Sequence, residues 1–202
     1  DTLEEAVSAA ESGDTIQLGE GHYSLYNKEY KGKEIKTITK GKNLTFVGKG
    51  TDKTFWGIGA DVPAPDKFGT EYNGDYSFDG ADTITFKNMT LQSSTADYLG
   101  FIRAKNTVVE GCVVNGKTFY WGYETATFKN TVFNPPQGDY AFWTYSSPVM
   151  TLENCTFNSS GKTINVYSDY NADKTDITLN INNCTVNSID GTAKPVLNIN
   201  DS

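Results

Sequence analysis

Side chains able to carry out acid–base or metal chemistry are few in this sequence. Asp75, Asp79 and Asp82 lie close together, and glycoside hydrolysis requires two placed carboxylates. Two of the three stand beside a glycine in a turn dipeptide, so turn formation explains them more simply. Arg103, with Asp97 nearby, is the only candidate for a calcium-assisted elimination, which needs carboxylates on the ion and a basic proton acceptor. We therefore assign no catalytic residue, metal ligand or cofactor.

Catalysis by a thiol is the least favoured reading of the three cysteines, Cys112, Cys155 and Cys184. A reactive thiol needs a histidine or another group that lowers its pKa, and the only histidine, His22, lies far away in the sequence. The odd count and the absence of a CxxC pair argue against a disulfide framework. We expect inert, buried thiols, with a disulfide between Cys155 and Cys184 as the alternative.

The cysteines belong to a phrase that recurs along the chain. It reads apolar, any, apolar, polar, Asn or Gly, small or sulfur-containing, any, apolar, and its copies span 84–91, 107–114, 126–133, 150–157 and 179–186. Its fifth position is Asn88, Gly111, Asn130, Asn154 and Asn183, at intervals of 23, 19, 24 and 29 residues. Each interval suits one coil of a β-solenoid.

The physics of the phrase supports a stack of short strands. Alternating apolar residues mark one buried face of a strand. Asn and Gly tolerate positive φ and permit a sharp bend, after which an inward position resumes. Like residues then lie above like in successive coils, so the asparagines are expected to form a hydrogen-bonded ladder. The position after each bend is expected to form one interior column of Met89, Cys112, Thr131, Cys155 and Cys184.

Aromatic residues gather in four clusters, each placed after a copy of the phrase: 98–101, 119–123, 140–145 and 166–170. All four are therefore expected on one side of the solenoid, where alternation sends about half of each cluster inward. The others are expected either to strengthen the sheet through cross-strand pairs or to form a platform for sugar rings or a protein. The candidate ligand contacts are Tyr120, Trp121, Tyr123, Phe142, Trp143 and Tyr145.

The N-terminal region has a different pattern. Residues 1–13 have helical apolar spacing, with Asp1 or Thr2 as N-cap and Gly13 as the end, and predict a helix that caps the solenoid. Strands are expected at 14–18, 43–47 and near 35–39, with a turn at 19–23. Residues 51–80 interrupt the repeat and predict a long loop, held by its aromatic residues or carrying function.

Here the sequence resembles a known group. Residues 3–10, followed by 12–18 and 21–23, resemble the opening of pectin-lyase-like β-helix proteins, in which a capping helix leads into the first coil. Residues 43–50 are similar to their second coil. The resemblance covers most of the chain and implies a right-handed parallel β-helix, but the group contains lyases, esterases, hydrolases and many non-enzymatic surface proteins.

Two enzyme families of this group are disfavoured by particular residues. Residues 115–130 are similar to the pectin methylesterase segment whose catalytic aspartate would fall at Thr118 or close to it, and threonine cannot replace a carboxylate there. Polygalacturonase-like hydrolysis needs clustered aspartates and a Gly-His-Gly motif, which His22, in the capping coil, does not match.

The composition limits the classes of partner that this chain is expected to bind. The net charge of −8 disfavours nucleic acid, because phosphate binding needs a basic surface. There is no apolar run long enough for a membrane span. The last residues, 196–202, offer no evident cap, so we expect either that the native chain continues or that an oligomer covers this end.

The sequence therefore predicts an all-β protein: one single-stranded, right-handed parallel β-helix domain over 1–202, of about seven coils, with a short N-terminal capping helix. We expect it to be part of a larger extracellular or cell-surface protein, beside other domains of that chain. The expected function is non-catalytic, adhesin-like binding of a glycan or a host protein. The alternatives are a carbohydrate-active enzyme (polysaccharide lyase or pectin-esterase-like) and a structural stalk or spacer.

Overall fold

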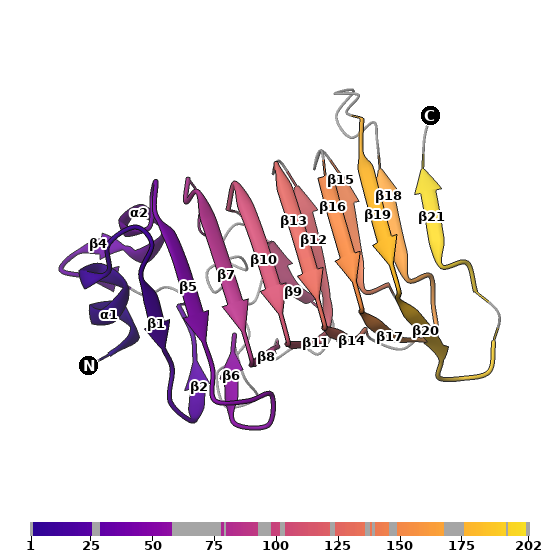
Figure 1. The fold of residues 1–202 in the computed structure, drawn as a ribbon, viewed down its shortest axis with the longest axis horizontal. Helices are drawn as coiled ribbons and strands as arrows, with labels where there is room; N and C mark the ends of the chain where they lie inside the picture. Colours follow the sequence, from indigo (N-terminus) through magenta and orange to yellow (C-terminus); the bar gives the residue numbers. More distant parts are fainter. Residues whose placement is uncertain are drawn as a thin grey trace.

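The computed structural model describes residues 2–25, 29–57, 78, 80–92, 98–101, 104–121, 124–135, 138, 140–145, 149–167, 176–192 and 194–200. Three parallel sheets stack their strands along one long axis, with the N-terminus at one end and the C-terminus at the other (Figure 1). The chain is thus a single-stranded, right-handed parallel β-helix with a short N-terminal helix, as the repeat predicted.

Two of the sheets contain seven strands each, one from each of seven successive coils. Sheet A comprises β1 (Thr15–Gln17), β5 (Asn43–Val47), β7 (Thr83–Lys87), β10 (Asn106–Glu110), β13 (Thr125–Lys129), β16 (Val149–Glu153) and β19 (Thr178–Asn182). Sheet B comprises β2 (Gly21–Tyr23), β6 (Thr54–Trp56), β8 (Thr90–Leu91), β11 (Val113–Asn115), β14 (Val132–Asn134), β17 (Thr156–Ser159) and β20 (Thr185–Ser188).

The third sheet holds the four predicted aromatic clusters, and we call it the aromatic sheet. Its strands are β9 (Tyr98–Phe101), β12 (Lys117–Trp121), β15 (Phe142–Tyr145), β18 (Ile164–Tyr167) and β21 (Leu197–Asn200), which pair in this order. The expectation that all four clusters share one side of the solenoid is confirmed for the strands that the structure describes.

The corners between sheets A and B have the backbone that the phrase predicted. Its fifth residue adopts the left-handed conformation in every copy, with φ between 49° and 63° at Asn88, Gly111, Asn130, Asn154 and Asn183. Asparagine and glycine reach this region at the least cost, so the bend recurs without strain at a fixed place in each coil. Asn183 Nδ2 donates to Asn154 Oδ1 at 2.6 Å, which confirms that step of the expected ladder.

Rows of aromatic and aliphatic side chains fill the interior. Phe46 stacks on Phe86 with ring centroids 5.7 Å apart, and Phe133 stacks on Phe157 at 4.6 Å with an interplanar angle of 8°. These four rings are almost completely buried. Because paired strands place equivalent residues one above another, a large residue in one coil needs a matching residue in the next, which keeps the register of the stack.

A second asparagine ladder, which the sequence reasoning missed, lies at sheet B. Asn134 Nδ2 donates to Asn115 Oδ1, Asn158 Nδ2 to Asn134 Oδ1, and Asn187 Nδ2 to Asn158 Oδ1, at 3.0, 2.8 and 3.0 Å. Each of these asparagines follows the left-handed residue of its coil by four positions. The four hydrogen-bonded side chains therefore tie four successive coils together on the outside of the solenoid.

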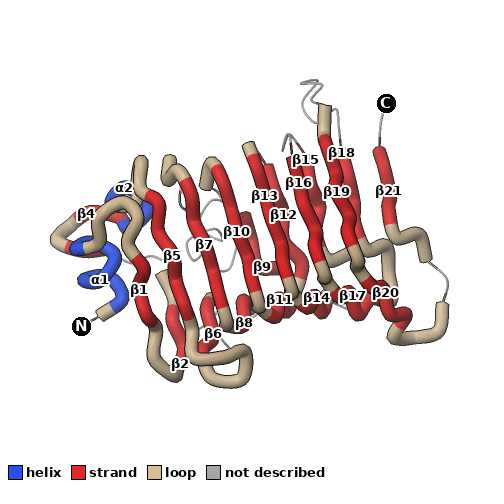
Figure 2. Tube along the Cα trace, viewed as in Figure 1, coloured by secondary structure: helices blue, strands red, loops and turns tan. Residues whose placement is uncertain are grey.

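The N-terminal end carries the described helices, and strands and loops make up the rest of the described chain (Figure 2). Helix α1 (Leu3–Ala9) begins with a capping box: Thr2 accepts from the Glu5 N–H, and the Glu5 carboxylate accepts from the Thr2 N–H. This confirms Thr2 as the N-cap. The predicted end at Gly13 is wrong: Ala10 is already extended, because the chain must straighten before it enters β1.

Two further expectations near this end are wrong. The segment near 35–39 is a helix, α2 (Ile35–Ile38), whose buried Ile35 and half-buried Ile38 lie on one helical face. It contacts α1, and a hairpin of β3 (Glu29–Tyr30) and β4 (Lys33–Glu34) precedes it. Residues 19–23 are only in part a turn, since they contain β2.

The predicted loop at 51–80 is also shorter at its start, because Thr54–Trp56 is β6 and pairs in register with β2. Trp56 and Phe78 are buried in the core beside Phe46. Residues 58–77 and 79 of this segment lie outside the described residues. In the described part of the chain, no helix is long and apolar enough to cross a membrane.

Candidate functional site

Five of the six predicted ligand contacts lie on two neighbouring strands of the aromatic sheet. Tyr120 and Trp121 belong to β12, and Phe142, Trp143 and Tyr145 belong to β15. The two strands are parallel and in register. The structure therefore brings these positions together, as predicted. Tyr123, the sixth, lies outside the described residues.

The register continues across the sheet and aligns residues from successive coils. Trp121 pairs with Tyr145, which pairs with Tyr167, and Phe101 pairs with Phe119, which pairs with Trp143. Tyr120 pairs instead with Thr144, and Phe142 with Ile164. The aromatic positions thus form two rows that run along the solenoid axis, separated by one residue that alternates to the other face.

Buried residues identify which face is the core. Thr144 is fully buried, Val166, its partner in β18, is 7% exposed, and Ile164 is 1% exposed. Strand positions 144, 164 and 166 therefore point toward the interior. By alternation, the positions in register between them, 143, 145, 165 and 167, belong to the other face of the sheet.

Asn165 lies at the centre of this other face, paired with Trp143 on one side and with Asn198 on the other. It is 7% exposed, and its Oδ1 has no hydrogen-bond partner among the described residues. A buried amide oxygen without a donor costs about 1–3 kcal/mol relative to a satisfied one. The sequence reasoning missed Asn165, because it began the fourth cluster at Val166 and not at the start of the strand, Ile164.

The other candidate residues do not join this site. His22, on β2, stacks on Phe55 of β6 with centroids 4.7 Å apart, at the N-terminal end of sheet B. Asp82 is exposed beside sheet A, and Thr118 belongs to β12. The remaining candidates, Asp75, Asp79, Asp97 and Arg103, lie outside the described residues. Across the described residues, no three His, Cys, Asp or Glu side chains gather as metal ligands would.

The cysteines occupy the interior column that the phrase predicted. Cys112 and Cys155 are buried, and Cys184, in the last described coil, is half-buried. Cys112 Sγ donates to the carbonyl of Glu110, two residues earlier, and Cys155 Sγ donates in the same way to Glu153. Burial raises the pKa of both the Cys112 and Cys155 thiols to about 11, so both are protonated and weakly nucleophilic at neutral pH.

Charges alternate in sign on the outer face of sheet A. Lys87 Nζ lies 2.8 Å from Glu110 Oε2, and Lys129 Nζ lies 3.4 Å from Glu153 Oε2. The hydrogen bond and charge of Lys87 hold the pKa of Glu110 below its usual value. These side chains remain more than a third exposed, so the pairs keep this face soluble and in register more than they add stability.

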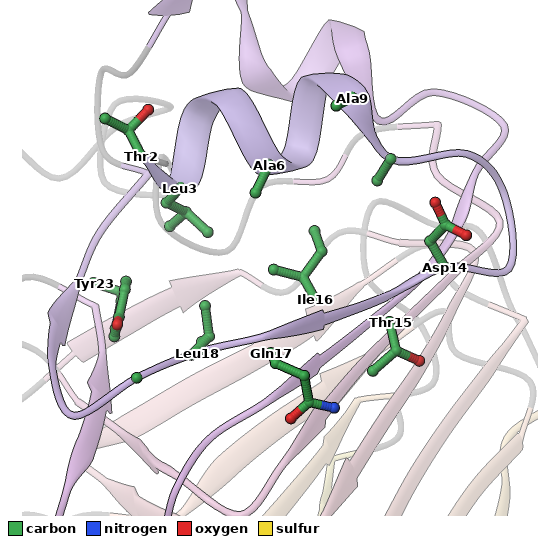
Figure 3. A pocket seen from close by; sticks show the side chains of 12 residues that line it. Thr2, Leu3, Ala6, Ala9, Asp14, Thr15, Ile16, Gln17, Leu18 and Tyr23 are labelled. Carbon is green, nitrogen blue, oxygen red and sulfur yellow. The ribbon is translucent and has the colours of Figure 1, made fainter.

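One cavity lies at the opposite end of the solenoid from the C-terminal coils, between α1 and the edge strand β1 (Figure 3). Its volume is about 590 Å³. Leu3 and Ala6 of the helix face Ile16 and Leu18 across it, and Tyr23 lies at one side. None of the six predicted contacts lines this cavity. It exists because the small residues of α1 do not fill the space above the first coil.

Comparison with known proteins assigns the chain to a family but indicates no activity. A family model described as a protein of unknown function, DUF3737, matches residues 60–201, which is more than two thirds of the chain. No curated protein matches the sequence, and no solved structure matches the fold. The matched region contains every strand of the aromatic sheet and all three cysteines. The chain belongs to the DUF3737 family.

Proposed function

We propose that this chain is a non-catalytic, adhesin-like binding module of an extracellular or cell-surface protein, and that the outer face of its aromatic sheet recognises a glycan. The observation that carries the proposal is the alignment of aromatic positions over successive coils, Trp121 with Tyr145 and Tyr167, and Phe119 with Trp143. Tyrosine and tryptophan supply large, amphipathic contact surfaces at little entropic cost, and they are enriched where proteins bind ligands.

The repeat of this surface suits an extended, repeating ligand. Paired positions in neighbouring strands lie about 4.8 Å apart along the solenoid axis. A chain of sugar rings laid along the axis would meet the aromatic positions of one row in succession. A host protein is the other occupant that such a surface could take, and it is expected to use the same positions.

The register also divides the five candidates that lie on described strands. The proposed ligand contacts are Trp121, Trp143 and Tyr145, whose strand positions alternate to the outer face of the sheet. Tyr120 pairs with the buried Thr144, and Phe142 pairs with the buried Ile164. We propose that these two aromatic residues support the sheet from inside. Substitutions of the two groups should therefore have different effects: lost binding for the first, lost stability for the second.

The test is a glycan-array screen of the wild-type chain and two variants, with and without calcium. The double variant Trp121→Ala with Trp143→Ala is expected to lose the binding that the wild type shows. Phe55→Ala removes a half-buried aromatic ring from sheet B, far along the axis, and is expected to bind normally. Equal binding by the double variant and the wild type would refute the proposed site. A wild type that binds no glycan would refute glycan recognition and favour a protein ligand or a spacer.

A further inference from the structure

We propose that Cys155 and Cys184 form a site of oxidative modification, at which a small disulfide oxidant such as glutathione disulfide links two successive coils covalently. This inference does not depend on the proposed glycan site. It rests on the interior column of the repeat, in which Met89, Cys112, Thr131, Cys155 and Cys184 succeed one another.

The two thiols occupy equivalent positions in neighbouring coils. β17 pairs with β20 so that Thr156 lies opposite Thr185, and the Thr185 N–H donates to the Cys155 carbonyl at 2.9 Å. The residues just before these threonines, Cys155 and Cys184, therefore occupy stacked positions in successive coils. Stacked coils separate such residues by about 4.8 Å, which lies within the Cα–Cα range that disulfides span.

The remaining cysteine provides an internal comparison. The neighbours of Cys112 in the column are Met89 and Thr131, so no second thiol lies in the adjacent coils. Cys112 otherwise matches Cys155: each Sγ donates to a carbonyl of the preceding coil, Phe86 or Phe128, and each residue is 1% exposed. Cys155 thus has a second thiol in the next coil, whereas Cys112 has no thiol in either neighbouring coil.

An oxidant reaches the pair through Cys184, which is half-buried. Cys155, in contrast, is 1% exposed. The order of events is therefore set by burial: Cys184 reacts first and Cys155 second.

The chemistry balances with the oxidant named. The Cys184 thiolate attacks one sulfur of glutathione disulfide, forms a mixed disulfide and releases one glutathione thiolate. The Cys155 thiolate then attacks Cys184 Sγ, forms the Cys155–Cys184 bond and releases the second glutathione. Two protein thiols lose two protons and two electrons, and one oxidant disulfide becomes two thiols. The second step needs a local opening of the coil that contains Cys184.

The experiment compares the wild-type chain with Cys112→Ser and Cys184→Ser after incubation with glutathione disulfide at pH 8. Intact mass, free-thiol counts and a tryptic map under non-reducing conditions are measured. The wild type is expected to lose two hydrogen atoms in mass and to keep one free thiol. Lys162 and Lys174 separate Cys155 from Cys184, so the linked peptides identify the bond. Cys112→Ser should form the same bond and keep no free thiol.

Cys184→Ser should form no internal disulfide and should keep both thiols at the same oxidant concentration. A second readout is thermal unfolding, where oxidised wild type should unfold at a higher temperature than its reduced form, and Cys184→Ser should show no such difference. Three free thiols in the treated wild type, a mixed disulfide at Cys184 that never resolves, or a linkage that includes Cys112 would each overturn the proposal.

Discussion

The left-handed corner asparagines make a prediction that separates backbone strain from side-chain hydrogen bonding. Asn154 has φ 53° and accepts a hydrogen bond of 2.6 Å from Asn183 Nδ2. Asn154→Ala loses that bond, worth about 1 kcal/mol net, and replaces asparagine, which tolerates the left-handed region, with alanine, for which this conformation costs about 1–2 kcal/mol. Asn154→Gly loses the bond alone. We therefore expect losses in the free energy of unfolding of about 2–3 kcal/mol for alanine and about 1 kcal/mol for glycine.

Asn158 is the matched control, because it donates to Asn134 and accepts from Asn187 but lies in an ordinary strand. Here Asn158→Gly should be less stable than Asn158→Ala, since glycine adds a backbone entropy cost of about 0.5–1 kcal/mol to the lost bonds. Thermal unfolding followed by circular dichroism measures all four variants, at about 2–4 °C per kcal/mol for a chain of this size. If alanine is tolerated as well as glycine at position 154, the corner argument is refuted.

Three further substitutions test the packing and the charges of the solenoid. Phe157→Ala should lower the free energy of unfolding by about 3–5 kcal/mol, because Phe157 is 1% exposed and stacks on Phe133; the half-buried Phe55→Ala should lose far less, and equal losses would contradict this. Gly48→Ala should destabilise by about 1–3 kcal/mol, since its Cβ would lie 2.5 Å from the Asn88 carbonyl oxygen and 2.8 Å from Thr54 Cβ; an unchanged unfolding temperature would contradict the close approach. The Lys87 charge lowers the pKa of Glu110, so the stabilisation is present above the ordinary pKa of 4.5 and is lost as the pH falls through the lowered pKa. At neutral pH the wild type should thus be more stable than Glu110→Gln, by no more than about 1 kcal/mol for so exposed a pair, and the two unfolding temperatures should converge in acid and in molar salt; a difference that widens in acid would contradict the sign.

Local sequence was sufficient for the repeating part of the fold. Each of these coils contains its own alternation and its own left-handed Asn or Gly, so the five copies located the strands of sheets A and B from β7 to β20, and the corners between them, without any knowledge of long-range contacts. The second asparagine ladder was available by the same reasoning, because Asn115, Asn134, Asn158 and Asn187 all follow the corner by four residues.

The N-terminal end shows where local preference was insufficient. β-branched residues at 35, 37, 38 and 39 favour a strand, but Ile35 and Ile38 are three residues apart and lie on one helical face toward the core end. Contact with α1 decides the outcome, and that contact cannot be inferred from the segment alone.

The candidate site could be predicted from the sequence only in part. The clusters indicated which side of the solenoid carries the aromatic residues, because each cluster follows its phrase. They did not indicate which residues of each strand face outward, because the register across β12, β15 and β18 depends on loops of different length. Burial of Thr144 and Val166 supplied that information, and Asn165 became visible only when its unpaired oxygen was found.

The central claim is that Trp121 and Trp143 form an exposed binding platform, and acrylamide quenching of tryptophan fluorescence tests it most directly. The chain has three tryptophans, and the third, Trp56, is fully buried in the core. Phenylalanine substitutions in pairs leave one tryptophan in each variant. We predict that Trp121 and Trp143 are quenched strongly, that Trp56 is protected, and that an array-identified glycan shields the first two. Quenching of Trp121 and Trp143 as weak as that of Trp56 would contradict the platform and assign these residues to packing alone.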